Sequence, residues 1–418
     1  MAFIKGGIGI KHAYGIYKNC LKFVQKLESE GTLASSTVAN PHFVSGVYFG
    51  MGTFNLFLSL FPAKIMKLFE FVGFNTNRDT GLKLLEAGGA LHGSLRGPLC
   101  DLSLLVFHSF LGGTFQLPDC DLGKAEVILK KDLQQFPNGA IFLFFEGKIN
   151  QGKKLIRASI DSYSKAIKAE VVWKQLHHIC YWENTWNHAL LLEWEKAADF
   201  AGKLLDENKW SKSFYAYQQA AFLIMLGDSK HQPKIDQLLE SVPKNKQKIA
   251  GKSIPIEKFA IRKARQYFNQ NKSLVLPGLE LLYVWSYTRL FGESVSETLA
   301  LLDKTEKEIA ARGQYDNAVD DTCLCTIIRG CLKREEGDST AAEEAFNFVL
   351  ASEKTIHLDH YLVPFARMEL GRLFMDTDRL DEAKELLEST KKYKKFSNEN
   401  TLAFRVHLLT AELEKRII

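Results

Sequence analysis

The chain has 418 residues, of which 46 % are hydrophobic, 25 % are charged and 10 are proline. This composition lies in the globular range and excludes collagenous, low-complexity and mainly disordered proteins. The formal net charge of +5 is too small over this length to indicate nucleic acid as a partner. Seven cysteines, an odd number, with no basic and then apolar leader before residue 30, argue against a secreted disulfide scaffold and predict a reducing compartment.

The first notable element in chain order is an uncharged stretch at residues 43–61. It has the length of a membrane span and carries the helix-pairing pattern Gly46-x-x-x-Gly50. Serine, threonine and asparagine recur inside it, so its mean hydropathy is low for a span. We therefore favour an apolar helix buried in the core, and membrane or lipid-droplet attachment through this stretch is the alternative.

A repeated spacing of residues predicts pairs of antiparallel helices. A small residue is followed 12 positions later by a second small residue, and four positions after that by a bulky one. The three sets are Gly147, Ser159 and Tyr163; Gly330, Ala342 and Phe346; and Gly371, Ala383 and Leu387. Helices pack at about 9 Å where small side chains lie at the crossing. The spacing predicts an all-α fold, an α-solenoid or superhelix of tetratricopeptide-like helix pairs.

Between these sets the period of the apolar residues stays close to that of a helix. A helix at 193–206 is expected to pair with one at 173–182, and a further helix is expected at 214–226. The predicted segments are an N-terminal helical region (1–121), tetratricopeptide-like helix pairs (122–243), an exposed basic connection (244–255) and C-terminal tetratricopeptide-like repeats with a capping helix (256–418).

The motifs that carry chemistry are all incomplete. Residues 251–253 read Gly-Lys-Ser but lack the earlier glycine and the strand of a phosphate-binding loop. His177 and Cys180 share a helical face, yet no second pair of ligands lies nearby at metal spacing, and the cysteines from Cys323 onward point to different helix faces. We predict no catalytic residue, metal or cofactor and a non-enzymatic protein. Packing is favoured for the histidine and tryptophan cluster, and an aromatic binding site or a nucleophile at Cys180 is the alternative.

A groove for protein partners is the function that the repeats favour. In a superhelix of tetratricopeptide type the concave surface is formed by side chains near the first small residue of each pair. The predicted groove residues are Phe144, Phe145, Lys148, Arg334, Arg372 and Met375. The three cations would make the groove mildly positive, and an ordinary solvated face is the alternative for each.

Several longer motifs occur together and in order along the chain. They lie at residues 46–55, 58–62, 68–74, 210–217 and 251–263, with two more at 177–182 and 359–364. Together they resemble the tetratricopeptide repeat protein 39 family, in particular its A and B branches. That family is similar to the fungal inclusion-body clearance protein family.

The resemblance implies a cellular location and a biological role, which composition and spacing do not. It implies a cytoplasmic scaffold or adaptor that binds proteins of unknown identity, with the nucleus or a lipid-associated membrane surface as alternative locations. It also implies a role in protein turnover or aggregate handling that is linked to lipid regulation. Family members carry a further helical region ahead of the position of Gly6, so this chain is expected to lack part of the family's length.

Overall fold

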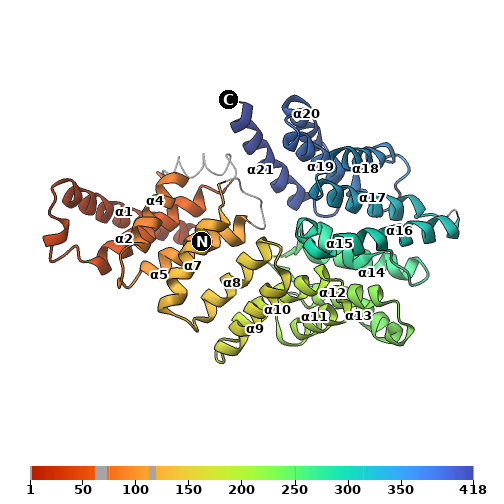
Figure 1. Ribbon diagram of the computed structural model, residues 1–418, viewed down its shortest axis with the longest axis horizontal. Coiled ribbons are helices and arrows are strands. Elements are labelled where there is room, and N and C mark those ends of the chain that lie inside the picture. The colour runs from red at the N-terminus through yellow and green to blue at the C-terminus, as the bar shows by residue number, and fades with distance from the viewer. Residues whose placement is uncertain are drawn as a thin grey trace. The chain divides into compact units, whose positions relative to one another are not determined.

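The computed structural model describes residues 2–61, 73–74, 76–112, 119–249, 251–313 and 315–417. The chain divides into two compact units, Met1–Phe145 and Glu146–Ile418. The described residues form helices joined by short turns, with one hairpin of two-residue strands (Figure 1). The predicted all-α class is therefore confirmed. The predicted segment boundaries at 121, 243 and 255 stay predictions.

The N-terminal unit contains seven helical elements and the beginning of an eighth among its described residues. They are α1 (Ala2–Ser29), η1 (Leu33–Ser35), α2 (Pro41–Leu58), α4 (Arg78–Gly89), α5 (Gly97–Leu105), the π-helical turn η2 (Val106–Leu111), α7 (Leu122–Gln135) and α8 (Ala140–Gly152). Helix α2 begins with Pro41 in its first turn, where a missing N–H costs nothing, and the Asn40 side chain accepts the Phe43 N–H at 3.0 Å.

The uncharged stretch 43–61 forms most of α2, and one face of this helix is core. Val44 and Met51 are only 3 % and 4 % exposed. A Cβ atom placed on Gly52 would come within 2.7 Å of the Leu85 side chain, so the glycine permits the close crossing of α2 and α4. The buried Asn55 amide donates to a carbonyl of its own helix. The polar side chain of Asn55 thus has a hydrogen-bond partner inside the protein, as expected if α2 is a core helix.

A second finding bears on the membrane alternative. Within the part of the chain that the structure describes, none of the helices combines the length and the apolar character needed to cross a membrane. Residue 62 and most of the family motif at 68–74 lie outside the described residues.

The C-terminal unit continues from α8 through a long series of helices. They are α9 (Ile156–Ala169), α10 (Lys174–Leu190), α11 (Trp194–Glu207), α12 (Lys212–Leu226), η3 (Ser229–His231), α13 (Gln232–Lys244), α14 (Pro255–Asn269), α15 (Pro277–Val284), η4 (Thr288–Leu290), η5 (Gly292–Ser294), α16 (Val295–Arg312), α17 (Ala318–Glu335), α18 (Ser339–Ala351), α19 (Leu362–Asp376), α20 (Leu380–Thr390) and α21 (Glu399–Ile417). Strands β1 (Lys248–Ile249) and β2 (Lys252–Ser253) form an antiparallel hairpin in the predicted basic connection. Most successive helices pack side by side in chain order (Figure 1).

The spaced residues meet where two helices of a pair cross. A Cβ atom placed on Gly147 would lie 2.5 Å from the ring of Tyr163, and one on Gly330 would lie 2.6 Å from the ring of Phe346. The third pair is looser, with 3.2 Å between such an atom on Gly371 and Leu387. Glycine is therefore required where an aromatic ring fills the crossing, because any side chain would overlap the ring.

The middle residues of the three sets lie in the same crossings. Ser159 is fully buried, and its hydroxyl donates to the Gly147 carbonyl at 2.7 Å. Ala342 and Ala383 are also fully buried.

A shared turn identifies a fourth pair with the same architecture. Lys154, Gly337 and Asp378 each lie seven residues after the glycine of their pair and have positive φ angles of 64°, 82° and 61°. Leu192 has the same backbone conformation, with φ of 57°, between α10 and α11. In each turn the next N–H bonds back five residues into the first helix, as in a Schellman motif.

The residues of the fourth pair show why its spacing was missed. Counting back seven from Leu192 places Thr185 where the other pairs have glycine, and Ala201 where they have the bulky residue. Both are fully buried. The larger and smaller residues have exchanged helices, so a search for a small residue followed by a bulky one passes over this pair.

Candidate partner-binding site of the C-terminal unit

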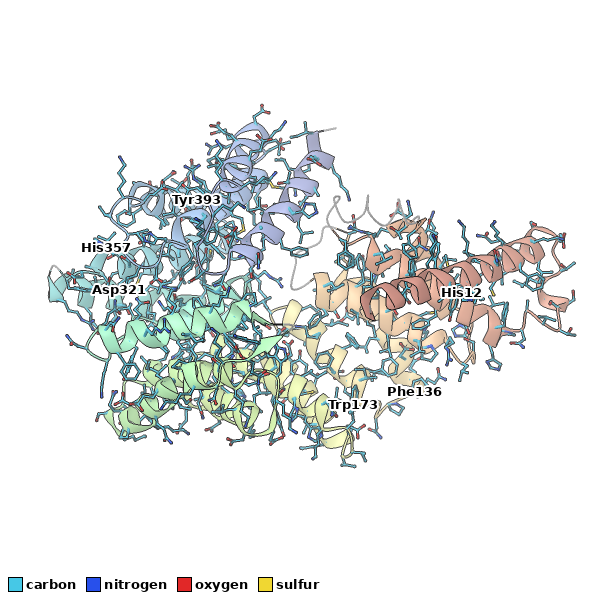
Figure 2. The ribbon with its side chains drawn as sticks, turned by 180° about the vertical axis from the view of Figure 1, so that it is seen from behind. His12, Phe136, Trp173, Asp321, His357 and Tyr393 are labelled. Carbon is cyan, nitrogen blue, oxygen red and sulfur yellow. The ribbon has the colours of Figure 1, made fainter. Side chains whose placement is uncertain are left out.

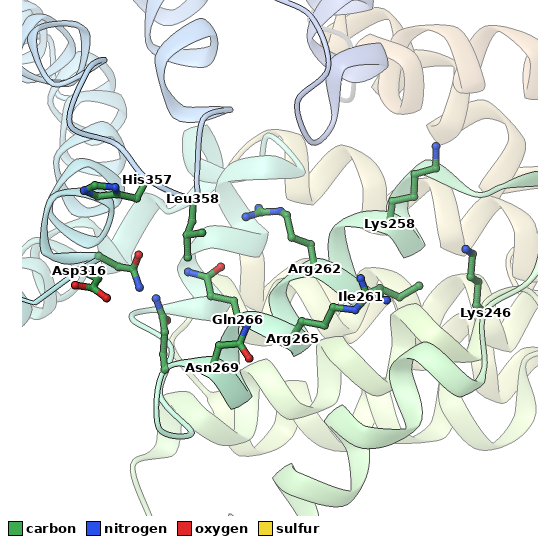
Figure 3. Close-up of a pocket in the computed structure, with 12 residues that line it drawn as sticks. Lys246, Lys258, Ile261, Arg262, Arg265, Gln266, Asn269, Asp316, His357 and Leu358 are labelled. Atoms are coloured by element: carbon green, nitrogen blue, oxygen red, sulfur yellow. The ribbon is translucent and has the colours of Figure 1, made fainter.

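A pocket of about 730 Å³ opens beside α14 in the C-terminal unit (Figure 3). Its lining comes from α14, the connection after α13, the residues before α17 and the loop between α18 and α19. The lining residues are Lys246, Lys258, Ile261, Arg262, Arg265, Gln266, Asn269, Gln270, Asp316, Asn317, His357 and Leu358. Four of these are lysine or arginine, and Asp316 alone among them is acidic. The pocket therefore presents an excess of positive charge.

The helical spacing of α14 brings most of these side chains to one face. Residues 258, 262, 265, 266 and 269 recur at intervals of three and four, which places them along the same side of a helix. Figure 3 shows Lys258, Arg262, Arg265 and Gln266 on this helix, with His357 and Leu358 on the loop near them. The opposite side of α14 is core, because Ala260, Ala264 and Tyr267 are at most 2 % exposed.

A buried cluster of charges adjoins the pocket through Arg262, which belongs to both. The Lys263 ammonium lies 2.9 Å from a Glu280 carboxylate oxygen and 3.2 Å from one of Asp359. The Arg262 guanidinium contacts the other Asp359 oxygen at 2.5 Å. The Tyr361 hydroxyl donates to Glu280 at 2.7 Å. The paired charges join α14 and α15 to the loop that precedes α19.

The electrostatics keep Asp359 ionised at neutral pH. Burial raises the pKa of Asp359, but the nearby charges of Lys263 and Arg262 outweigh burial and lower this pKa to about 2. Burial also raises the pKa of Glu280, and there the neighbouring cations do not fully compensate. Asp359 therefore remains the anion that holds one end of Arg262.

The loop 357–359 is held by a second acidic residue. Asp320, which is 1 % exposed, accepts the backbone N–H groups of His357, Leu358 and Asp359 at 2.9, 2.8 and 2.7 Å. The neighbouring Asp321 accepts the Tyr315 hydroxyl at 2.8 Å, and Asp321 and His357 mark this region in Figure 2. Three N–H bonds to one carboxylate fix the loop that carries one wall of the pocket.

The predicted groove residue Lys148 lies inside the protein. Its side chain is 6 % exposed and pairs with Glu183 at 3.1 Å, and Gln151 and the Tyr287 hydroxyl also bond to this carboxylate. Substituting Lys148 would leave a buried carboxylate without its cation, so it would perturb folding as well as any binding.

Of the C-terminal groove cations, Arg334 is also covered and Arg372 is half-buried. The Arg334 side chain is 8 % exposed and pairs with Glu369 at 2.5 Å, and Arg405 of α21 pairs with the same carboxylate at 2.9 Å. Burial raises the pKa of Glu369, but the arginine charges outweigh it and lower this pKa to about 2. Burial, and then the charge of Arg334, lowers the pKa of Arg372 to about 10.

The apolar residues predicted for the groove are also buried. Phe144, Phe145 and Met375 are 5 %, 4 % and 3 % exposed. The structure therefore does not present the six predicted residues as one open wall. In the C-terminal unit the cause is tertiary: the segment after α15 covers the α10 side of the stack, and α21 covers α19.

Aromatic packing accounts for most of the tryptophan cluster. Trp186 is fully buried and stacks on Trp285 and Tyr287, with ring centroids 5.9 and 5.1 Å apart. Trp173, labelled in Figure 2, and Trp210 differ, because they are 50 % and 47 % exposed. The core interpretation holds for the buried members of the cluster only.

The candidate nucleophiles lie in packing environments. Cys180 is fully buried, and burial together with the Glu183 charge raises the pKa of its thiol to about 12. The His177 ring contacts the Glu170 carbonyl, with 2.5 Å between Nε2 and the oxygen. All seven cysteines are free thiols. Among the residues that the structure describes, no three His, Cys, Asp or Glu side chains gather as metal ligands would.

The pocket was missed at the sequence level because its residues are scattered between positions 246 and 358. The signal that was available is the polar face of α14, which runs parallel to a buried face in the same helix. That pattern predicts an exposed helix and does not by itself distinguish a binding surface from a solvated one.

The crossings and the four shared turns define the class: an all-α protein built from tetratricopeptide-like helix pairs. Residues 1–335 match the family described as Iml2/Tetratricopeptide repeat protein 39. The chain belongs to this family, as the motifs quoted above implied. The tetratricopeptide repeat protein ttc-39B of Caenorhabditis elegans is 32 % identical over 412 residues, which cover 97 % of this chain and 70 % of that protein.

The chain also aligns with a solved structure. The crystal structure of the P58(IPK) TPR domain aligns with 84 % of this chain and 97 % of its own, at 14 % identity and a TM-score of 0.19.

Proposed function

We propose that this chain is a non-enzymatic scaffold or adaptor that holds partner proteins and acts in protein turnover or aggregate handling, with a link to lipid regulation. The observation that carries the proposal is the open basic pocket on α14, in a unit where aromatic rings fill the helix crossings at Gly147 and Gly330. Membership of a tetratricopeptide repeat family supports a protein-binding role. The buried state of Cys180 is consistent with the absence of catalysis.

The proposal includes the location of the protein in the cell. A cytoplasmic site is proposed, with the nucleus or a lipid-associated membrane surface as alternatives that a fluorescent fusion would distinguish. Attachment through residues 43–61 is not proposed further, because the buried face of α2, including Val44 and Met51, packs within its own unit.

Proximity labelling in cells tests the scaffold. The full chain is fused to a biotin ligase, and the control is the same ligase fused to an unrelated helical-repeat protein of similar size. We expect a reproducible set of proteins enriched over the control, including components of the turnover machinery. Absence of any enrichment would contradict the scaffold.

A second measurement separates the turnover role from the scaffold. The half-lives of the enriched proteins are compared in cells with and without this chain. We expect them to change on its depletion. Enriched proteins whose half-lives are unaltered would remove the turnover role and leave the scaffold standing.

A further inference from the structure

We propose that the pocket on α14 binds an acidic peptide segment of a protein partner. The inference rests on the proposed scaffold function and deepens it, because it states the chemistry by which one partner is held. Three observations carry it: uncompensated positive charge, an arginine with a free side, and buried amides without partners.

The charge of the pocket is not balanced by the protein itself. Lys258 and Arg265 are exposed on α14, and Lys246 is exposed on the adjoining connection. Across the described ranges, none of these three side chains forms an ion pair or a hydrogen bond. Three unpaired cations around one cavity raise the local concentration of an anionic ligand and favour its binding.

Arg262 adds hydrogen-bond donors with a fixed geometry to the positive charge of the pocket. Its Nη1 atom is held by Asp359 at 2.5 Å, whereas Nε and Nη2 have no hydrogen-bond partner among the described residues. These two atoms form the side of the guanidinium that accommodates a carboxylate with two parallel bonds. Both are shielded from solvent, so a ligand reaches them when a neighbouring side chain moves. Leu358, 44 % exposed, lies beside Arg262 in Figure 3.

The amide side chains distinguish a peptide from a phosphate. Gln266 is 5 % exposed, and its Oε1 atom has no donor among the residues described; the Nε2 atom of Gln270 likewise has no acceptor. A peptide backbone supplies both N–H donors and carbonyl acceptors, whereas a phosphate supplies chiefly acceptors. A phosphate would therefore leave Gln266 unpaired. His357 is the one ring in the lining, so the pocket offers no platform for stacked nucleobases.

Fluorescence anisotropy with the full chain tests the proposal. The probe is a labelled ten-residue peptide of alternating glutamate and glycine, and the control peptide has glutamine in place of glutamate. The pocket variant is Lys258→Glu with Arg265→Glu. The matched control is Lys304→Glu with Lys307→Glu on α16, which makes the same change of net charge at exposed positions away from the pocket.

We expect the glutamate peptide to bind the wild type and the α16 control alike and to bind the pocket variant at least about tenfold more weakly. The glutamine peptide should not bind measurably to any of the three proteins. Inorganic phosphate, at the same concentration as the glutamate peptide, should not displace the glutamate peptide from the wild type. Equal weakening in both variants would overturn the proposal, because net charge alone would explain binding. Displacement by phosphate would overturn it in favour of a phosphate site.

The same variants separate this proposal from the scaffold. In proximity labelling, we expect the pocket variant to lose a subset of the proteins that the wild type and the α16 control enrich. If all of them stay enriched, the pocket is not a partner site although the scaffold stands. If the wild type enriches nothing, the scaffold itself fails.

Discussion

The regular helix pairs of the C-terminal unit and the region around α14 are held together by different contacts. In a regular pair such as α17 and α18, Gly330 lies against the ring of Phe346 and the crossing is filled. Around α14, the buried Lys263 lies between Glu280 and Asp359 and joins three segments by charge. A filled apolar crossing leaves no surface for a ligand, whereas paired charges at the edge of a pocket can be shared with one. The difference teaches that the open pocket lies where the repeat is interrupted, and this is where we propose that a partner binds.

The largest effect is expected from breaking the charge cluster. Asp359→Ala removes the anion that serves both Lys263 and Arg262, and we expect the free energy of unfolding to fall by about 3–5 kcal/mol. Urea unfolding followed by circular dichroism measures it. The control is Glu343→Ala, which breaks a partly exposed pair with Arg379 and should cost less than about 1 kcal/mol. Equal costs for the two variants would show that the cluster contributes no more than a surface pair.

The region around α14 also predicts a pH dependence. Burial raises the pKa of Asp321 from its ordinary 3.8 to about 6. Between about pH 4 and pH 6 the folded chain therefore keeps a proton that the unfolded chain releases, so this group's contribution to stability falls as the pH rises, by up to about 3 kcal/mol.

Asp321→Asn should remove that decline, because an amide does not titrate and its oxygen can still accept the Tyr315 hydroxyl. Urea midpoints at several pH values from 4 to 7 measure the effect. The exposed Asp316→Asn serves as the control and should keep the slope of the wild type. If the slope also persists in Asp321→Asn, then Asp321 titrates normally.

The regular pairs should respond to single methyl groups. Gly147→Ala and Gly330→Ala push a Cβ atom into an aromatic ring and should each destabilise the protein by about 1–3 kcal/mol. Gly371→Ala should cost less, because its nearest neighbour is 3.2 Å away. Thermal unfolding of the three variants gives the order.

Gly15→Ala provides the matched control for these glycines. It lies in α1 with nothing within 4 Å of an added Cβ, and alanine there should stabilise by up to about 1 kcal/mol. A uniform gain in all four variants would show that helix propensity outweighs the crossings.

The smallest effect is expected from the pocket cations. Lys258→Glu with Arg265→Glu changes two exposed side chains and should leave the free energy of unfolding within about 0.5 kcal/mol of the wild type. Thermal unfolding alongside the peptide-binding assay measures this. A large loss of stability would mean that these cations hold the fold, and the contrast between the exposed pocket cations and the buried charge cluster would disappear.

Much of the fold could be predicted because its signals are local. The glycine of each pair and its bulky partner are 16 residues apart in the sequence, so both lie within one helix-turn-helix unit. The fourth pair, α10 and α11, was expected from its apolar period, but the glycine spacing does not detect it because Thr185 and Ala201 exchange the usual sizes. The turn at Leu192 was not recognised, since a left-handed leucine has no signature in the sequence.

The candidate site could be predicted far less well. The positive character expected from Lys148, Arg334 and Arg372 is present as charge, but Lys148 and Arg334 are paired inside the protein. Those pairs join residues 35 positions apart, which no helical spacing reveals. The unpaired cations lie instead on α14 (Lys258 and Arg265) and on the connection before it (Lys246), where the sequence analysis predicted a basic connection and a repeat helix but no groove residue.

The amino-acid sequence by itself determined the all-α class, the helix pairs and the family, because each depends on residues within one or two helices. Tertiary structure alone decided which faces remain open. The segment after α15 and the helix α21 cover the surface that repeats would otherwise expose, and the pocket joins α14 to a loop almost a hundred residues later. Burial of a face depends on what packs against it, and a covering element far along the chain leaves no trace in the pattern of the face it covers.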